Sequence, residues 1–431
     1  MPVADKLRAL VKHRHAWQKL DWTSKTVVDL PASLHTGRAC ELVAGMLAFQ
    51  EDGPDIYTLT LQEDSRVTKH VLGIDPHTYV RLTMDPTQDL LAVVYRSGPA
   101  FGFVSHNLAL RALSANQPHP MARRPTILVE TGREELEMVV IADDVVGISF
   151  GAPGSIRVWN WRTGALLADV RRVHTIRPDF QFISPRVFVT ASPTDSGWID
   201  IFMILPEKAP DSEGAVHVTR LRFPELEHAD GLSLWNLHAV SIYAGPVYEH
   251  PLPGSFIPKN ENRIFFFVYR LASTAGETRW MRLMIHHDTL AVHLSRYGRE
   301  GRTEYLDVKW EDWGPRDTRI LAGDRSDWLV PGTAHGERVV NHVFNRQQLQ
   351  VLDFRPIPGD PKNNLSEDNS RGFVLGSSTI QGAPFKDPVT TYLPFRCTLL
   401  ATDDEFDTIL MDHEHIIVAE EHSNKITVFK F

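Results

Sequence analysis

The sequence predicts an all-β fold, a single irregular β-propeller of about seven blades preceded by a short N-terminal helix. Three observations predict it: one hairpin sequence typical of a propeller blade, a long series of short strand-like runs, and a turn-and-strand phrase that recurs along the chain. We expect residues 1–21 to form the helix and residues 22–431 to form the propeller.

The hairpin sequence spans residues 154–169. Ile156 and Val158 alternate with Arg157, which is the period of a half-buried strand. Gly164 follows Arg-Thr and supplies the positive φ of a tight turn. A strand that closes on Trp-Asn-Trp-Arg and reverses at this Gly is typical of the third and fourth strands of a WD-repeat-like blade.

Strand-like runs begin after Trp22 and continue to the C-terminus, and we expect no internal helix between them. One of these runs, residues 39–49, is expected to form a single strand. The recurring phrase is an acidic or Pro-containing turn followed by an apolar strand, and it occurs at residues 84–94, 142–150, 183–190 and 411–418. Its irregular spacing of about 40 to 80 residues predicts blades with insertions.

The two ends of the chain are expected to share one blade. Thr26-Val27-Val28 can pair with the last strand, residues 426–431, which would close the ring and remove its unpaired edges. Two stretches rich in Pro, Gly and polar residues, 206–214 and 355–387, are expected to be exposed insertions between strands.

The N-terminal helix is predicted by apolar residues at three- and four-residue spacings. Leu7, Leu10, Val11, Trp17 and Leu20 recur in this pattern, with Lys and Arg between them. We expect the helix to pack on the domain that follows. The alternative is a docking helix for a partner, and its candidate partner-binding residues are Leu7, Leu10 and Trp17.

Composition excludes several classes of function. The net charge of −9 argues against nucleic acid as the main partner, because phosphate binding needs a basic face. Two cysteines, Cys40 and Cys397, exclude a disulfide framework and a Cys-rich zinc site, and we expect both thiols to be buried. The polar N-terminus and the short apolar runs predict no signal peptide and no membrane span, hence an intracellular protein, cytoplasmic or nuclear.

No catalytic motif is present, and we expect no enzyme, cofactor or metal. The sequence lacks a nucleophile elbow, a phosphate-binding Gly loop and an H-E-x-x-H motif. His413 and His415 are two apart on an expected strand and would share one face, as metal ligands can. Without a third ligand at fixed spacing we interpret them as surface histidines, with His422 nearby.

Other chemistry-bearing residues have structural interpretations. The residues His286-His287-Asp288 are expected to form a turn between strands, and the acidic residues 143–144 and 403–405 are expected to form turns. Trp159 and Trp161 lie on one side of their strand and are expected to pack between blades; the alternative is a surface hot spot. The same alternatives apply to Trp310 and Trp313.

One longer segment, residues 5–22, resembles a helix of known proteins. Its sequence DKLRALVKHRHAWQKLDW is similar to the helix that follows the F-box in F-box domain-containing proteins of mushroom-forming (agaricomycete) basidiomycetes. Later phrases resemble the same family in the same order: residues 41–45, 84–91, 113–120, 142–147, 158–164 and 182–185.

The resemblance implies an F-box-type substrate receptor. In such proteins the F-box docks on the linker subunit of a cullin ubiquitin ligase, and the β-rich remainder captures the target. The F-box itself, a helical module that opens near L-P-x-E-(I/L), is not found ahead of Asp5. We therefore expect either the post-F-box part of a longer protein or a relative without the docking module.

Three functional hypotheses follow. The first is an intracellular protein–protein interaction module, the substrate-recognition part of an F-box-type receptor or a derivative of one. The second is a propeller enzyme, a hydrolase or lyase, with convergent polar side chains and a pocket at the central channel. The third is an architectural subunit of a stoichiometric complex.

Overall fold

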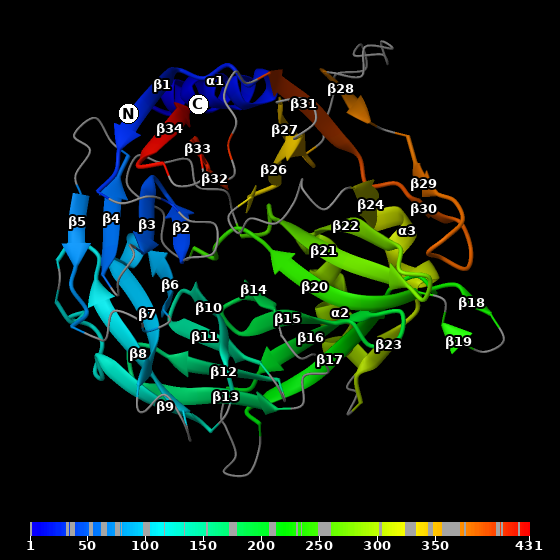
Figure 1. Cartoon of the computed structure of the whole chain (residues 1–431), viewed down its shortest axis with the longest axis horizontal. Coiled ribbons are helices and arrows are strands. Elements are labelled where there is room, and N and C mark those ends of the chain that lie inside the picture. Colours follow the sequence, from blue (N-terminus) through cyan, green and yellow to red (C-terminus); the bar gives the residue numbers. More distant parts are fainter. Residues whose placement is uncertain are drawn as a thin grey trace.

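The chain forms a ring of sheets around a central axis in the computed structural model (Figure 1). The structure describes residues 2–31, 34, 39–50, 55–61, 67–73, 78, 80–97, 104–115, 117–132, 134–151, 154–171, 179–206, 213–229, 232–233, 235–248, 260–300, 304–323, 333–343, 348–355, 371–374, 376–401, 406, 408–420 and 423–431. Within these residues, seven sheets of four or five strands are the seven blades of a β-propeller.

The first three blades are four-stranded antiparallel meanders. Blade 1 contains β2 (Cys40–Val43), β3 (Met46–Gln50), β4 (Ile56–Thr60) and β5 (Val67–His70). Blade 2 contains β6 (Val80–Asp85), β7 (Leu90–Ser97), β8 (Val104–Ala112) and β9 (Thr126–Gly132), with a 3₁₀ turn η1 (Pro86–Gln88) between β6 and β7. Blade 3 contains β10 (Leu136–Ala142), β11 (Val145–Phe150), β12 (Ser155–Asn160) and β13 (Ala165–Arg171).

The next two blades share an insertion. Blade 4 contains β14 (Phe180–Ser184), β15 (Val187–Ser192), β16 (Trp198–Ile204) and β17 (Ala215–Arg222). Blade 5 contains β20 (Trp235–Tyr243), β21 (Ile264–Ser273), β22 (Thr278–His286) and β24 (Thr318–Gly323). Between β22 and β24 lie α2 (His287–Glu300), β23 (Leu306–Val308) and α3 (Trp310–Asp317). Strand β23 pairs in parallel with β17 and becomes a fifth strand of blade 4.

The last two blades complete the ring. Blade 6 contains β25 (Ala334–His335), β26 (Arg338–Val343), β27 (Gln348–Asp353), β31 (Phe395–Ala401) and β28 (Arg371–Val374). Blade 7 contains β32 (Thr408–Met411), β33 (His415–Ala419), β34 (Lys425–Lys430) and, as its outer strand, β1 (Ser24–Asp29). Two further pairs stand outside the blades: β18 (His228–Ala229) with β19 (Leu232–Ser233), and β29 (Ser378–Ile380) with β30 (Val389–Thr391).

Ring closure follows the prediction. Strand β1 pairs antiparallel with β34, and Thr26, Val27 and Val28 lie opposite Val428, Thr427 and Ile426. The two chain ends therefore meet in one blade, as the N and C marks in Figure 1 show. Because the first and last strands belong to the same sheet, the ring cannot open without breaking backbone hydrogen bonds.

Three expectations about secondary structure are wrong. The run 39–49 is not one strand: Ala44 and Gly45 have φ angles of 51° and 76°, and they form the turn between β2 and β3. The insertion in blade 5 contains α2 and α3, whereas no internal helix was expected. His286 ends β22 and His287 begins α2, so these residues are not a turn between strands. Leu290 and Leu294 of α2 pack on the core between blades 4 and 5. This tertiary packing stabilises the helix, although the local sequence signal for it is weak.

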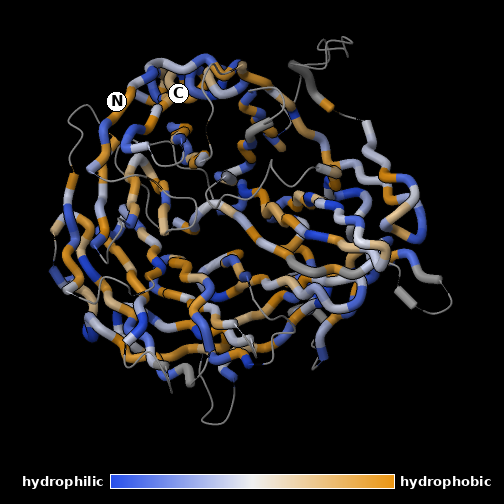
Figure 2. The backbone as a smooth tube through the Cα atoms, viewed as in Figure 1, coloured by the Kyte–Doolittle hydropathy of each residue, from blue (hydrophilic) through white to orange (hydrophobic). Residues whose placement is uncertain are grey.

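Each blade is buried on both faces, and one apolar cluster fills every space between neighbouring blades. In β7, Leu90, Ala92 and Val94 contribute to the cluster shared with blade 3. Leu91 and Val93 point the other way, to blade 1. This is why the central strands are continuous apolar runs in the sequence, and Figure 2 shows the hydrophobic colour continuing along them. Trp159 and Trp161 lie between blades 2 and 3, as expected.

The region 355–387 is only partly the exposed insertion that was expected. Residues 356–370 and 375 lie outside the described residues, as do residues 207–212 of the shorter loop. In the part after residue 370, β28 is a strand of blade 6, whereas β29 and β30 pack against β24 of blade 5. Arg319 is fully buried and donates to the Leu393 carbonyl at 2.7 Å and to Ser378 Oγ at 2.6 Å. Phe385 is 3% exposed. This burial fixes the segment on the propeller.

Close packing between blades 3 and 4 yields a first prediction. A Cβ at Gly147 of β11 would lie 2.7 Å from the Phe180 ring, which is itself fully buried. Gly147→Ala is therefore expected to lower the free energy of unfolding by roughly 1–3 kcal/mol, because the ring has no room to move. Urea denaturation measures this. The matched control is Gly376→Ala, where a Cβ meets nothing within 4 Å; equal stability of the two variants would contradict the packing argument.

Candidate functional site

The N-terminal helix α1 (Val3–Lys19) is fixed to the propeller by its C-terminal half. Trp17 is 1% exposed and stacks on Phe431, with ring centroids 4.1 Å apart. Its Nε1 donates to the His413 carbonyl at 3.0 Å, and the Arg338 guanidinium lies 4.6 Å from the ring centroid. Arg338 belongs to blade 6 and Phe431 follows the last strand of blade 7, so α1 bridges these two blades.

The helix therefore packs on the domain that follows, as expected, and the alternative in which Trp17 contacts a partner does not fit this structure. The indole is enclosed by the propeller and its polar atom is satisfied, so Trp17 anchors the helix. His13 supports the same anchor: its Nε2 lies 3.0 Å from the same His413 carbonyl, and burial lowers its pKa to about 4. A neutral His13 can donate Nε2–H to this oxygen at physiological pH.

The other two candidate residues lie on the opposite half of α1 and are accessible. Leu7 is 60% exposed and Leu10 44%. Val3 and Val11, 83% and 45% exposed, continue the same face of the helix. Val11 belongs to the predicted helix pattern, but neither Val3 nor Val11 was among the candidate partner-binding residues. Each lies four residues from Leu7, and this spacing is the signal that places them on the same exposed face.

One face of the propeller is held together by contacts between successive blades, made by the turns that join the first and second strands and by strand residues close to these turns. Gly45 N donates to Asp412 and so links blade 7 to blade 1. Met84 N donates to Glu41 Oε2 at 2.8 Å and links blade 1 to blade 2. Gln88 Nε2 donates to the Asp143 carbonyl at 2.9 Å and links blade 2 to blade 3.

The chain of contacts continues around the ring. Arg186 donates to both carboxylate oxygens of Asp144 at 2.7 Å and links blade 3 to blade 4. Buried Arg263 donates to the Ile183 carbonyl at 2.6 Å and links blade 4 to blade 5. Ile264 N donates to the Gly336 carbonyl at 2.8 Å and links blade 5 to blade 6. The His335 and His413 rings, with centroids 5.9 Å apart, link blade 6 to blade 7. We call this set of contacts the turn ring.

Several members of the turn ring are ionisable groups with shifted pKa values. Burial raises the pKa of Glu41 to about 7, although hydrogen bonds from Met84 N and Thr83 Oγ1 act in the opposite direction. Burial alone would also raise the pKa of Asp412, but the hydrogen bond from His415 and the neighbouring histidines hold it well below its usual range. Burial lowers the pKa of His335 to about 3.

These shifts show how the carboxylates differ. Asp412 is ionised at neutral pH, because the donors around it lower its pKa. Glu41 titrates near neutrality, because burial penalises its charge more than its two donors compensate. The turn ring therefore contains a fixed negative charge at one blade seam and a protonatable group at the next.

A segment of the β20–β21 connection crosses the axis on this face. Val247 forms a parallel bridge with Ala142 of blade 3 and packs in the cluster between blades 3 and 4. Tyr248 packs in the cluster between blades 1 and 2. Both residues follow β20 of blade 5, so this described part of the connection reaches across the ring to blades 1 and 3.

The histidines expected to share one strand face are placed differently. His413 lies in the turn before β33, and His415 is the first residue of that strand. Both are buried, at 2% and 3% exposure, so the interpretation as surface histidines is wrong. In the described part of the chain, no group of three or more His, Cys, Asp or Glu side chains is arranged to hold a metal ion. His422 and the acidic residues 403–405 lie outside the described residues.

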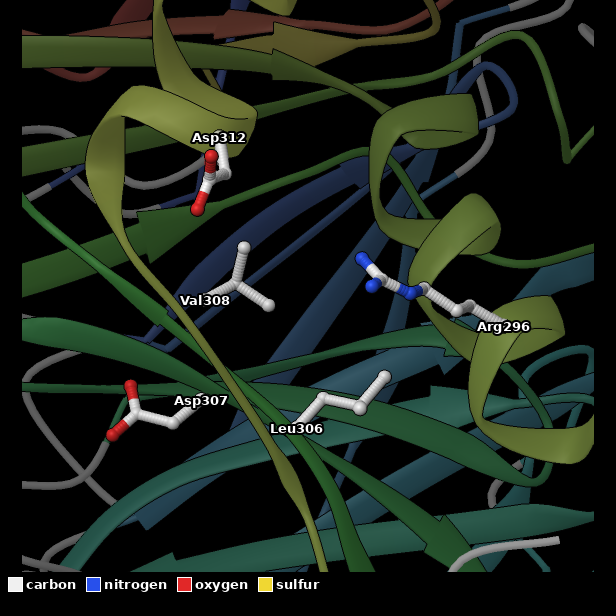
Figure 3. Close-up of a pocket in the computed structure, with 5 residues that line it drawn as sticks. All are labelled: Arg296, Leu306, Asp307, Val308 and Asp312. Atoms are coloured by element: carbon white, nitrogen blue, oxygen red, sulfur yellow. The ribbon is translucent and has the colours of Figure 1, made fainter. Parts of the chain in front are cut away.

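A groove of about 420 Å³ lies at the outer edge of blade 4, between α2, β23 and α3 (Figure 3). Leu306 and Val308 of β23 form its apolar floor. Arg296 of α2 and Asp312 of α3 face it from opposite sides. Asp307 of β23 also lines the groove, which therefore has two carboxylates and one guanidinium in its lining and lies on the circumference of the ring. No nucleophile or acid–base pair converges there.

The remaining predicted residues have structural positions. Trp310 and Trp313 are buried at 6% and 3% and meet edge to face, with centroids 5.1 Å apart. Burial raises the pKa of the Cys40 thiol to about 12 and raises that of Cys397 as well, so neither thiol is activated. Among the described helices, none has the length and hydropathy needed to cross a lipid bilayer.

The sheets thus define the protein as a seven-bladed β-propeller with an N-terminal helix. No protein-family model matches the chain, and no curated protein matches it. Among solved structures it is similar to a chain of the mitotic checkpoint complex (9% identity, 96% of each chain covered, TM-score 0.43). It is also similar to the WD40 β-propeller domain of Doa1 (11% identity, 95% and 98% covered, TM-score 0.42). A further likeness is to the WD40 domain of SCAP from fission yeast (7% identity, 91% and 81% covered, TM-score 0.38).

The shifted pKa of Glu41 yields a second prediction. Since its pKa rises from 4.5 to about 7 on folding, ionisation of Glu41 opposes folding increasingly between these pH values and fully above pH 7. Glu41→Gln removes this cost. The stability of the variant relative to the wild type should increase by roughly 1–3 kcal/mol between pH 5 and pH 8. Urea denaturation at each pH measures the free energy of unfolding of the two proteins. Glu130→Gln, at an exposed position, is the control. Parallel pH profiles for the wild type and Glu41→Gln would refute the raised pKa of Glu41.

The two halves of α1 yield a third prediction. Trp17→Ala should destabilise the protein by about 3–5 kcal/mol, because it removes a buried ring and leaves a cavity over Phe431. Leu7→Ala should change stability by no more than about 0.5 kcal/mol, because the side chain is exposed. Thermal unfolding and hydrogen exchange of α1 measure both changes. A similar effect of the two substitutions would show that the helix is not anchored as described.

Proposed function

We propose that the chain is a non-catalytic protein-interaction module whose target docks on the face opposite the turn ring. The observation that carries the proposal is that the turn ring uses its side chains in contacts between blades. Substitution there costs stability. Among the described residues, the connections at the other end of the blades, between second and third strands and from one blade to the next, take no part in this ring, so they can vary to fit a target.

Described parts of this second face are open to a partner. The turn between β21 and β22 contains Ala275, Gly276 and Glu277, all of them exposed. A Cβ at Gly276 would meet nothing within 4 Å. The turn between β15 and β16 contains exposed Thr194 and Asp195. We define these two turns as the rim.

The particular role we propose is that of the substrate-recognition part of an F-box-type ubiquitin-ligase receptor, or of a derivative that lacks the F-box. Its support is the resemblance of residues 5–22, and of the phrases that follow, to fungal F-box proteins. In this proposal α1 is the connection between a ligase-docking module and the propeller. The cullin-ligase linker subunit is then a partner wherever an F-box precedes the chain.

Affinity purification from the native cells tests the proposal. The chain should retain a reproducible set of proteins, and Ala275→Arg with Glu277→Arg should reduce their recovery at least severalfold, because the rim is where the target binds. Gln117→Arg, an exposed position at the turn-ring end of blade 2, is the matched control and should retain them. Equal recovery from both variants would contradict the rim assignment.

The ligase role has its own readout in the same experiment. The product of the native gene, purified with a tag at its N-terminus, should carry the cullin-ligase linker subunit in addition to the rim-dependent proteins. The tag avoids the C-terminus because Phe431 is buried under Trp17. Recovery of rim-dependent proteins without the linker subunit would remove the ligase role and leave the interaction module.

A further inference from the structure

A continuous apolar strip on the N-terminal half of α1 faces solvent, ahead of the C-terminal half that anchors the helix. Val3, Leu7, Leu10 and Val11 are between 44% and 83% exposed. Their spacing of four, three and one residues places them on one face of a helix. Scattered exposed aliphatic residues are ordinary, but four neighbours on one face mark an interaction surface. We call these four residues the free strip.

The free strip is held in a fixed direction. Ala16, Trp17 and Leu20 bury the C-terminal part of the helix in the cluster between blades 6 and 7. The Gln18 carbonyl accepts a hydrogen bond from Thr398 of blade 6 at 3.2 Å. Because α1 is anchored at this end, a partner that binds the free strip does not have to order it first, which lowers the entropic cost of binding.

The charges around the free strip identify the partner. The helix carries Lys6, Arg8, Lys12, Arg14 and Lys19 against a single acidic residue, Asp5, a net charge of +4 in a chain of net charge −9. We propose that the free strip docks on an acidic amphipathic helix of another protein, apolar on one face and flanked by Glu or Asp. The Leu and Val side chains of the free strip would pack on the apolar face of this partner helix. Lys6, Arg8 and Arg14, which are three or four residues from members of the strip, would pair with its acidic flanks.

Two other occupants fit less well. A second copy of the chain would bring the same Lys and Arg side chains together across the interface, which is repulsive. An anionic membrane usually takes helices with aromatic residues on the apolar face, whereas the aromatic side chain of this helix, Trp17, is buried. The remainder of the chain is acidic and would be repelled by such a membrane. The inference does not depend on the rim or on the ligase role.

The test uses the full chain and a synthetic helical peptide of several heptads, with Leu at the core positions and Glu at the flanking positions. Fluorescence anisotropy should show binding that weakens as salt is added. Leu7→Ser with Leu10→Ser should raise the dissociation constant about tenfold or more, because two apolar contacts are lost. Thermal unfolding should not change, since both side chains are exposed.

The controls separate this surface from others. Val27→Ser alters a residue that is 62% exposed on β1, outside the helix, and should leave the dissociation constant unchanged. A peptide with Lys in place of Glu should not bind. The proposal is overturned if the Glu peptide does not bind, if it binds the double Ser variant equally well, or if the Lys peptide binds as tightly. It is also overturned if the strip mediates self-association or binding to phosphatidylserine vesicles instead.

Discussion

Closure of the ring is the constraint on which the rest of the structure depends. Every blade has two apolar faces, so each needs a neighbour on both sides. Pairing of β1 with β34 supplies the last neighbour and covers Ile417 and Val428 of blade 7 with Leu42 and Leu47 of blade 1. An open ring would expose these two faces to water. The helix strengthens the same region, because Trp17 packs on the last residue of the chain.

Polar contacts divide the propeller into a structural face and a free face. The turn ring joins successive blades through backbone groups, carboxylates and buried Arg263. Such buried polar contacts stabilise one arrangement only while every partner is present, so this face tolerates little change. The connections at the other end of the blades carry no comparable circuit among the described residues. A recognition surface can therefore change there without altering the scaffold.

The helix α1 combines both kinds of surface in a single element. Its anchor half uses aromatic stacking and a shared carbonyl, which are specific and buried. Its other half carries aliphatic and basic residues that make no comparable contact with the propeller. The apolar residues of this helix continue from its C-terminal half into its N-terminal half. Leu7 and Leu10 stay accessible because the propeller packs on the C-terminal half.

Local sequence determined the class of fold, the turn at Gly164 and the pairing of Thr26–Val28 with the last strand, because these depend on period two, on positive φ and on unpaired edges. It also placed a helix at the N-terminus.

Tertiary structure alone decided which part of that helix is buried. Leu7 and Trp17 belong to one apolar periodicity, and only the contact of Trp17 with Phe431 distinguishes them. The roles of Glu41 and Arg263 could not be predicted from the sequence either, because their partners lie in other blades. Glu41 is 42 residues from its partner Thr83, and Arg263 is 80 residues from its partner Ile183. Helix α2 was missed because the blades 4 and 5 on which it packs bury Leu290, and no local signal reports that burial.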